Sequence, residues 1–205
     1  MELDRALIEI SQIRAQVART EIFRGYRWLT VGFSGAVALI TAALQWYFID
    51  EPLAMLTRYV GLWITAAACS MAATGIGMLA HLRCSDSVLS LEHTRSALEL
   101  FLPCVAVGAV VTLAITLRAT YAAWMLPGLW SLVFSLGIFA SGRLLPRALA
   151  LVAVYYFACG SLLLVPPSDA NTLAPWIMGL VFGVGQLLAA GILYITLERP
   201  DGHQT

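Results

Sequence analysis

The sequence predicts an all-α, polytopic membrane protein with six transmembrane helices. The first observation is that the 205 residues contain six apolar runs, at 28–49, 59–82, 100–117, 121–141, 148–165 and 173–197. The second is that the twelve basic and twelve acidic side chains all fall between or outside these runs. The third is composition: 12% of the residues are charged and 60% are hydrophobic, whereas soluble proteins have about 25% charged residues.

The length and the pattern of the runs favour helices over strands. At about 1.5 Å per helical residue, even runs 100–117 and 148–165 approach the thickness of a hydrocarbon core, about 30 Å. Transmembrane β-strands are segments of about ten residues that alternate in polarity, and the stretch 105–117 does not alternate. A helix also satisfies its own backbone hydrogen bonds inside lipid.

A polar arm, residues 1–27, precedes the first run and predicts a cytoplasmic amphipathic helix. Its apolar residues recur at alternating spacings of three and four, as in a coiled-coil seam. Five charges of one sign and four of the other give the arm a net charge of only +1, which favours a protein contact over an electrostatic lipid anchor. Docking on the protein's own inner face, pairing with another chain and lying in the membrane interface remain open. The predicted partner seam consists of Leu3, Ala6, Ile10, Ile13 and Val17.

The first run is expected to be a membrane span rather than a cleaved signal. It follows 27 polar residues, which are too many and too acidic for the start of a signal peptide. It ends in the aromatic cluster 46–48, and aromatic residues are enriched at the membrane boundary. Within it, Gly32 and Gly35 predict a close contact with another helix, and Gln45 is one of the few polar residues of the spans.

The arginines predict the orientation, because cytoplasmic segments of membrane proteins carry an excess of basic residues. Only Arg58 and Arg118 fall in the loops of one side. With six spans, the other ten share the opposite side, which includes both chain ends: Arg5, Arg14, Arg19, Arg24, Arg27, Arg83, Arg95, Arg143, Arg147 and Arg199. Both termini, including a tail at 200–205, are therefore expected in the cytoplasm. The chain has no lysine, as is common in GC-rich genomes, and a bacterial inner membrane is the expected location.

The segment 83–99, between the second and third runs, predicts a further cytoplasmic helix. Ser85 is a suitable N-cap, and Pro103 is expected to bend the chain where the third span begins. A helix here is expected to lie beneath the bundle and to meet the arm.

Small residues predict where helices approach closely, since they let backbones come together in lipid. In the last run, Gly179, Gly183, Gln186 and Ala190 share one helical stripe. A similar row in the second run could be its partner. These residues predict a helix-packing or oligomer face: Gly179, Gly183, Ala190, Cys69, Ala73 and Gly77.

A ligand site is predicted from the polar and aromatic residues at membrane depth. Trp130 follows the break in helix geometry expected at Pro127-Gly128, so it either packs between helices or lines a cavity. The predicted ligand-binding residues are Gln186, Trp130, Tyr155 and Tyr194.

Catalytic and cofactor chemistry finds little support. The four cysteines occur singly, and no pair of histidines or thiolates has metal-ligand spacing, so we expect no metal and no cofactor. Ser34 lies in a Gly-x-Ser-Gly sequence but lacks a histidine to act as its base. The remaining enzyme hypothesis would bring His81, Arg83 and Arg147 together at the inner surface. A chemical role of the Glu92-His93-Thr94-Arg95 cluster also stays open.

The sequence therefore favours a non-catalytic membrane subunit, scaffold or sensor that engages a partner or itself through cytoplasmic helices. The expected partners are membrane lipids and either a second copy or another protein, and no nucleic acid is expected. The alternative is a small transporter or a protein that binds a lipid or apolar ligand near Gln186 and Trp130.

Overall fold

Helices make up nearly all of the described chain, and the described residues contain no β-strand. The computed structural model describes residues 28–84, 88–142, 145–165 and 170–198, with side chains described in 28–77, 102–142, 145–165 and 172–196. The predicted arm, its seam and the tail lie outside these ranges, as do the side chains of His81, Arg83 and Glu92 to Arg95. The all-α class expected from the sequence is confirmed for the described residues.

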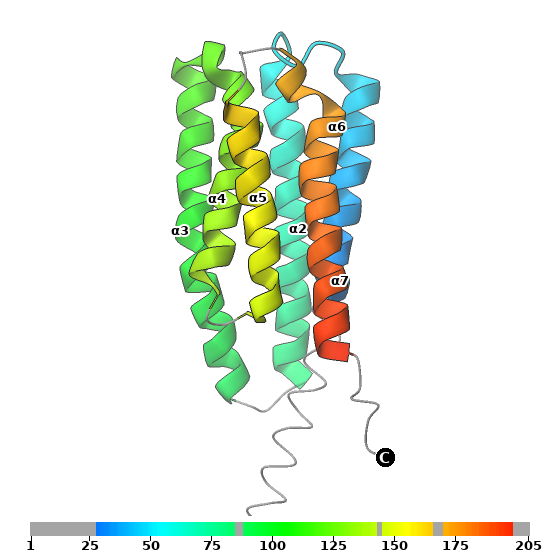
Figure 1. Ribbon diagram of the computed structural model, residues 1–205, viewed down its shortest axis with the longest axis vertical. Coiled ribbons are helices and arrows are strands. Elements are labelled where there is room, and N and C mark those ends of the chain that lie inside the picture. The colour runs from blue at the N-terminus through cyan, green and yellow to red at the C-terminus, as the bar shows by residue number, and fades with distance from the viewer. Residues whose placement is uncertain (1–27, 85–87, 143–144, 166–169, 199–205) are drawn as a thin grey trace, which may run out of the picture.

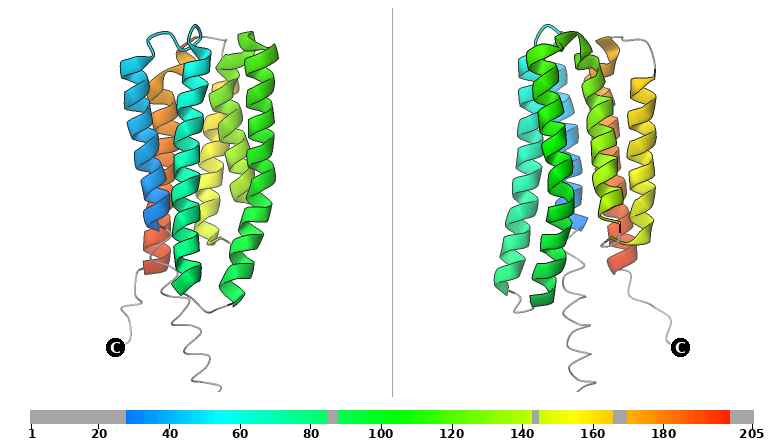
Figure 2. Two further views of the ribbon diagram at one scale, coloured as in Figure 1. Left: turned by 180° about the vertical axis from the view of Figure 1, so that it is seen from behind. Right: turned by 90° about the vertical axis from the view of Figure 1, so that its left-hand side faces the viewer.

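The helices lie side by side along one long axis and form a bundle (Figures 1 and 2). The first helix, blue and unlabelled in Figure 1, covers Trp28–Phe48. It begins at the lower end of the bundle as drawn there, which is also the end where the last helix stops. The helices that follow are α2 (Leu56–Cys84), α3 (Val88–Arg118), α4 (Leu126–Ala140), α5 (Ala150–Leu164), α6 (Pro175–Met178) and α7 (Gly185–Glu198).

Three of the predicted spans are interrupted or preceded by other helix types. A 3-10 helix, Thr120–Met125, leads into α4, and another, Arg147–Leu149, leads into α5. Pro127 and Pro175 lie in the first turns of α4 and α6, where the missing N–H of proline is not needed. The last span also contains a π-helical turn, Gly179–Val184, between α6 and α7, which periodicity does not predict.

The third span differs most from the prediction. Helix α3 begins at Val88 and continues through Pro103 to Arg118 without a break. The segment 88–99 therefore extends the third span along the bundle axis, and it does not form a separate helix beneath the bundle (Figure 1). Proline removes one backbone donor and crowds the preceding turn, but its neighbours continue the helix on both sides.

Five of the described helical stretches are long and apolar enough to cross a membrane: Trp28–Phe48, Leu56–Gly77, Thr120–Ala140, Arg147–Leu164 and Pro175–Thr196. The apolar part of α3, Leu102–Arg118, is shorter than these. The bundle is thus compatible with a multi-pass membrane protein.

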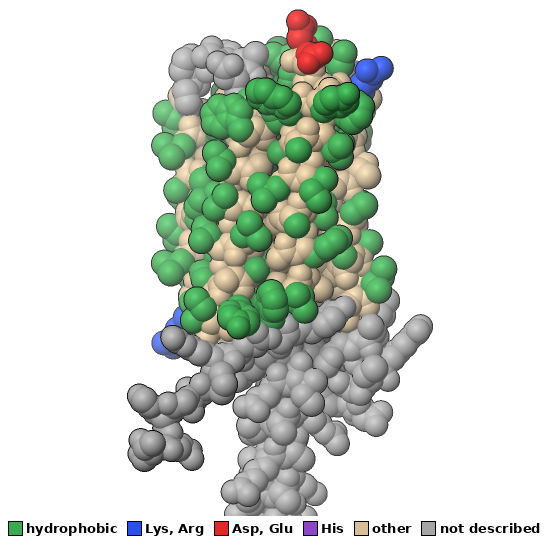
Figure 3. Space-filling model, turned by 90° about the vertical axis from the view of Figure 1, so that its right-hand side faces the viewer, with side chains coloured by type: hydrophobic (Ala, Val, Ile, Leu, Met, Phe, Trp, Pro, Cys, Tyr) green, Lys and Arg blue, Asp and Glu red, His purple; other side chains and the backbone are tan. Residues whose placement is uncertain are grey.

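The surface of the bundle agrees with a membrane environment. On the face shown in Figure 3, the coloured acidic and basic side chains lie at the two ends of the bundle, with a hydrophobic belt between them. The charged side chains that the structure describes are Asp50, Glu51, Arg58, Arg118 and Arg147. Large apolar side chains are well exposed around the belt, among them Ile40, Ile76, Val110, Leu136 and Leu162. In water so much exposed apolar surface would cause aggregation, whereas in lipid it is the ordinary outer face.

Helices α4 and α5 meet through two glycines, Gly128 and Gly160. A Cβ atom added at Gly128 would lie 3.1 Å from the carbonyl oxygen of Gly160, and one added at Gly160 would lie 2.8 Å from that of Gly128. The contact is reciprocal, so neither position accepts a side chain without movement of the backbone.

The buried apolar residues form two clusters. The first core joins the first helix, α2, α3, the start of α4 and the start of the last span, and it includes Tyr59, Trp63, Leu126 and Leu173. The second core joins α4, α5 and the last span through Val152, Tyr156, Val181 and Leu193. Interhelical polar contacts are found alongside both.

Candidate functional site

A buried amide, Gln45, links three elements in the upper half of the bundle. Its side chain is fully buried. The indole Nε1 of Trp63 on α2 donates a hydrogen bond to Gln45 Oε1 over 2.8 Å. Gln45 Nε2 in turn donates to the backbone carbonyl of Leu173 over 2.7 Å, just before α6. The first helix, α2 and the segment leading into the last span are thereby tied together by one side chain.

This junction was not predicted, although its components are visible in the sequence. Gln45 stands alone as an amide in an apolar run, which is a signal that it has a partner. Trp63 is only 6% exposed, and its N–H donates inside the bundle. By contrast, Trp46 and Trp176 are well exposed, as tryptophans at a membrane boundary are.

A second polar contact accounts for Trp130. Its indole Nε1 donates to Thr112 Oγ1 of α3 over 2.8 Å, and its ring stacks on that of Tyr59 with centroids 6.4 Å apart. Of the two placements left open for Trp130, the structure shows packing between helices. The Tyr59 hydroxyl is fully buried, and no partner for it is found among the described residues.

The stripe of small residues in the last span faces the first helix. A Cβ atom added at Gly179 would lie 2.9 Å from Ala42 Cβ, and one added at Gly183 would lie 2.6 Å from Leu39 Cδ2. A Cβ atom at Gly32 would lie 3.6 Å from Ala190 Cβ. The partner of the stripe is therefore the first helix.

The contacts described for the stripe do not include Cys69, Ala73 or Gly77 of the corresponding row on α2. Cys69 is exposed, Ala73 is half-buried and Gly77 is buried. A Cβ atom added at Gly61 or Gly75 would meet nothing within 4 Å, so α2 presents small residues to open space along part of its length.

The π-helical turn is held by a tyrosine of α5. The hydroxyl of Tyr155 donates to the carbonyl of Leu180 over 2.9 Å. A π-turn leaves carbonyl groups without their usual helical partner, and a neighbouring hydroxyl can satisfy one of them.

The next residue of α5, Tyr156, is fully buried against Gly185, where an added Cβ would lie 2.5 Å from the tyrosine ring and hydroxyl. Helical residues Phe134 and Phe182 complete this aromatic group, with ring centroids 4.9 and 5.5 Å from that of Tyr156.

The four predicted ligand residues do not converge on one site. Trp130 belongs to the first core, whereas Tyr155 packs against the second. Tyr194 is half-exposed, and its ring lies edge-on to Trp28 with centroids 5.3 Å apart. The Gln186 Cβ lies 3.2 Å from the position that a Cβ at Gly35 would occupy, so Gln186 sits on the packed stripe.

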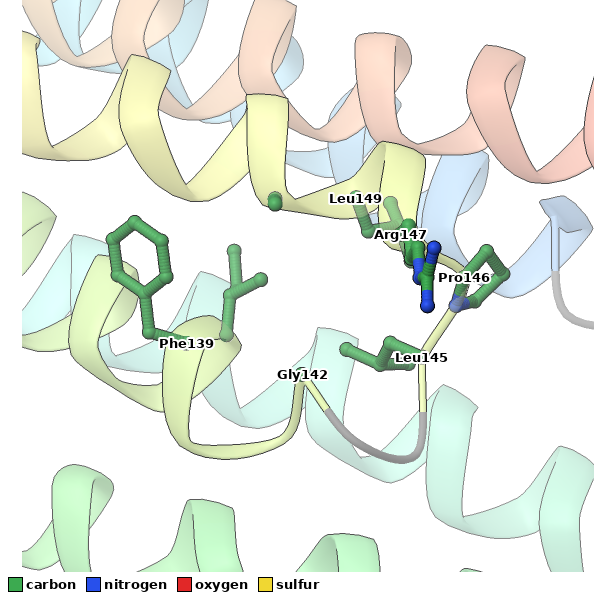
Figure 4. A pocket seen from close by; sticks show the side chains of 8 residues that line it. Phe139, Gly142, Leu145, Pro146, Arg147 and Leu149 are labelled. Atoms are coloured by element: carbon green, nitrogen blue, oxygen red, sulfur yellow. The ribbon is translucent and has the colours of Figure 1, made fainter.

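None of these four residues lines either of two hollows on the described part of the bundle. The smaller, of about 40 Å³, lies between the end of α4 and the start of α5 and has room for little more than one water molecule. Figure 4 shows Phe139 and Gly142 on one side of it and Leu145 to Leu149 on the other. The larger, of about 680 Å³, lies beside the loop 49–55 and the start of α6.

The described residues offer little reactive chemistry. They contain no group of three or more metal-ligating side chains. The Ser34 hydroxyl donates to the carbonyl of Val31 in its own helix over 2.7 Å, as a packing serine does. Arg147, the described member of the enzyme hypothesis, is exposed at the rim of the small hollow.

Comparison with protein-family models, with curated proteins and with solved structures finds no match to this chain.

Proposed function

We propose that the protein is a non-catalytic, multi-pass membrane subunit or scaffold that associates laterally with a second protein chain. The proposed topology has six spans and both termini in the cytoplasm, and the proposed location is a bacterial inner membrane. Lipids and either a second copy or another membrane protein are its proposed partners.

One observation carries this proposal: several polar side chains within the described spans form hydrogen bonds to neighbouring helices. Gln45 and Trp63 bond each other, Trp130 bonds Thr112, and Ser135 bonds the carbonyl of Ala153 on α5 over 2.8 Å. The five described charged side chains lie in loops or at helix ends. Proton relays and ion pathways use ionisable groups at membrane depth, so the described interior suits a structural role better than transport.

The topology is supported by the layout of α3 and of the arginines. Helix α3 runs alongside the other helices, and its 31 residues are enough for a sixth span, even though its apolar part is short. An even number of spans agrees with the first helix starting, and α7 ending, at one end of the bundle. Ten of the twelve arginines belong to that side in the sequence.

For the lateral contact we propose the small residues of α2, including the exposed Cys69 and the half-buried Ala73. Gly61 and Gly75 have open space where a side chain would be, so a partner helix could approach the α2 backbone closely. The cytoplasmic arm, with its seam from Leu3 to Val17, remains the second proposed contact. Its residues lie outside the described structure, so its support comes from the seam spacing alone.

The natural thiol of Cys69 provides a direct test of the α2 contact. In a variant in which Cys84, Cys104 and Cys159 are serine, mild oxidation in native membranes is expected to give a disulfide-linked dimer or adduct. Adding Cys69→Ser to that variant gives the control, which should stay monomeric. If the variant that keeps only Cys69 also stays monomeric, although Cys69 reacts fully with a maleimide, the proposed α2 contact is wrong.

Native mass spectrometry with bound lipids tests the arm. The full-length chain is compared with a shortened chain that begins at Trp28 and with an Ile10→Asp, Val17→Asp variant. A multimer or an added protein mass that is lost in both would support the seam. Unchanged association in both would remove the arm from the proposal and leave α2.

The alternative function is a small transporter or a protein that binds an apolar ligand near Gln186 and Trp130. It is favoured only by the π-turn beside Gln186, since π-turns recur at functional sites. Under this alternative, Gln186→Leu impairs ligand binding without lowering the thermal stability of the bundle. Losses of both together would instead mean that Gln186 is a packing residue.

A further inference from the structure

The groove at the upper end of the bundle combines features that neither packing nor the proposed subunit role explains. Its volume is about 680 Å³. One wall is the end of the first helix and the loop that follows, and the other is the start of the last span. The lining residues are Trp46, Ile49, Asp50, Glu51, Pro52, Leu53, Ala54, Ala174 and Pro175.

The charge in this groove is entirely negative. Asp50 and Glu51 are both exposed, and no Arg or Lys is among the lining residues. Within the part of the chain that the structure describes, neither carboxylate forms an ion pair, and the nearby Arg58 instead contacts the sulfur of Met55. The groove therefore favours a cation and disfavours phosphate or carboxylate groups.

An exposed indole lies on the same lining. Trp46 is 73% exposed, so its side chain is accessible to a ligand. Indole faces attract ammonium groups, and quaternary ammonium ions are recognised by aromatic rings combined with carboxylates. A divalent metal on two exposed carboxylates would complete its oxygen shell largely with water, so it would make no use of the indole or of the apolar lining.

The remaining lining residues are apolar, and they stand at the membrane boundary. Tyr47 and Phe48 beside Trp46 are 79% and 63% exposed, as in the aromatic belt of membrane proteins. A ligand in this position can keep its charge near Asp50 and Glu51 and place an alkyl portion against Leu53 and Pro175.

The groove is held in shape by buried bonds beneath it. The Gln45 amide holds the carbonyl of Leu173, the residue just before Ala174 and Pro175 in the second wall. On the first wall, Ile49 is buried in the first core and its N–H donates to the Gln45 carbonyl over 2.9 Å. Both walls are thus fixed to the same residue, and a preformed groove loses little entropy on binding.

We propose that this groove binds an amphiphilic organic cation, with its ammonium group between Trp46 and the carboxylates of Asp50 and Glu51 and its alkyl portion along the apolar lining. This site is independent of the lateral contact proposed above. Its ligand class is an alkylammonium compound, either quaternary or primary.

The test measures binding of hexyltrimethylammonium by titration calorimetry to the full-length protein in a maltoside detergent, which itself carries no ammonium group. Hexanesulfonate, of similar length and opposite charge, and tetramethylammonium, which lacks the alkyl portion, are the comparison ligands. The proposal expects hexyltrimethylammonium to bind at least about tenfold tighter than either, because both the charge and the alkyl chain contribute.

Two variants remove the proposed contacts while keeping the shape of the groove. Asp50→Asn with Glu51→Gln is expected to weaken binding at least fivefold, and Trp46→Leu about threefold to tenfold. The matched controls are Trp176→Leu, an exposed tryptophan outside the groove, and Arg58→Gln, a charge change at the same end. Both controls should bind within about twofold of the parent, since neither residue lines the groove.

Equal binding of hexanesulfonate, or an unchanged affinity in the Asp50→Asn, Glu51→Gln variant, would overturn the proposal. If tetramethylammonium bound equally well, the alkyl portion would contribute nothing, and the proposal of an amphiphilic ligand would be overturned in favour of a simple organic cation. Thermal unfolding of each variant shows whether the bundle is intact, and because these side chains are exposed, unfolding is expected to be unchanged.

Discussion

Trp63 donates its indole hydrogen to Gln45 across the first two spans, and both side chains are buried. The bond has a particular consequence because Gln45 uses its other end as well, on the carbonyl of Leu173. Residues 128 positions apart in the sequence are thereby fixed by one amide.

Replacing Gln45 with leucine should lower the stability of the bundle. The change leaves the Trp63 N–H and the Leu173 carbonyl buried without a partner, which costs about 1–3 kcal/mol. Unfolding in mixed micelles with increasing sodium dodecyl sulfate, followed by circular dichroism, measures the difference. Gln186→Leu is the control, because Gln186 is half-buried and should cost less. If the two variants lost the same stability, the Gln45 hydrogen bonds would contribute no more to the stability of the bundle than Gln186 does.

Gly183→Ala should loosen the contact between the first and last spans. The new Cβ would lie 2.6 Å from Leu39 Cδ2, so either the leucine or the helix has to shift. A loss of about 1–3 kcal/mol is expected, as for other overpacked sites. Leu39→Ala should recover part of that loss in a double-mutant cycle.

Gly191→Ala gives the matched control for Gly183→Ala, because an added Cβ there meets nothing within 4 Å. It should be neutral or stabilising, since alanine favours helix by about 0.5–1 kcal/mol over glycine. If both alanine variants lost the same stability, steric contact with Leu39 would not be the cause.

Two tyrosine-to-phenylalanine changes should differ in sign. Tyr59→Phe removes a buried hydroxyl without a described partner and should be neutral or stabilising by about 1 kcal/mol. Tyr155→Phe removes the hydrogen bond to the Leu180 carbonyl and should destabilise by about 0.5–1.5 kcal/mol. The same micelle unfolding assay compares them, and a destabilised Tyr59→Phe variant would show that this hydroxyl does have a partner.

Trp130 and Thr112 should be energetically coupled. Trp130→Phe keeps a ring beside Tyr59 but loses the donor to Thr112, and Thr112→Val loses the acceptor. The double-mutant cycle should give a coupling of about 0.6 kcal/mol, typical of hydrogen bonds between membrane helices. A coupling near zero would mean that the observed bond contributes nothing to stability.

The sequence predicted the class and most helix positions because hydrophobicity and length decide both. The first helix was expected at 28–49 and is found at 28–48, and the break before α4 follows from Pro127. The segment 83–99 was predicted to be helical, and 88–99 is helical, but it extends α3 along the bundle axis and does not form a separate helix beneath the bundle. Local patterns do not reveal how such a segment is directed relative to the bundle.

Which helix meets which was much harder to predict. The stripe at 179–190 was visible, but its partner could have been any span with small residues, and its actual contacts are with Leu39 and Ala42. Likewise, nothing near Gln45 in the sequence identifies the Leu173 carbonyl, because the two approach only after the bundle has closed. Packing partners in lipid depend on shape across the whole bundle, and short-range periodicity carries little of that information.

The contact between the first and last spans also sets an order of events in biosynthesis. The first helix is synthesised long before residues 179–190, so until then the face with Gly32 and Gly35 lacks the helix that it packs against. The glycine-lined pair α4 and α5, by contrast, is adjacent in the chain and can assemble as soon as both helices have entered the membrane. Closure of the bundle is therefore a late event, and a nascent chain that stops before the last span exposes an incomplete helix surface to the quality-control proteases of the membrane.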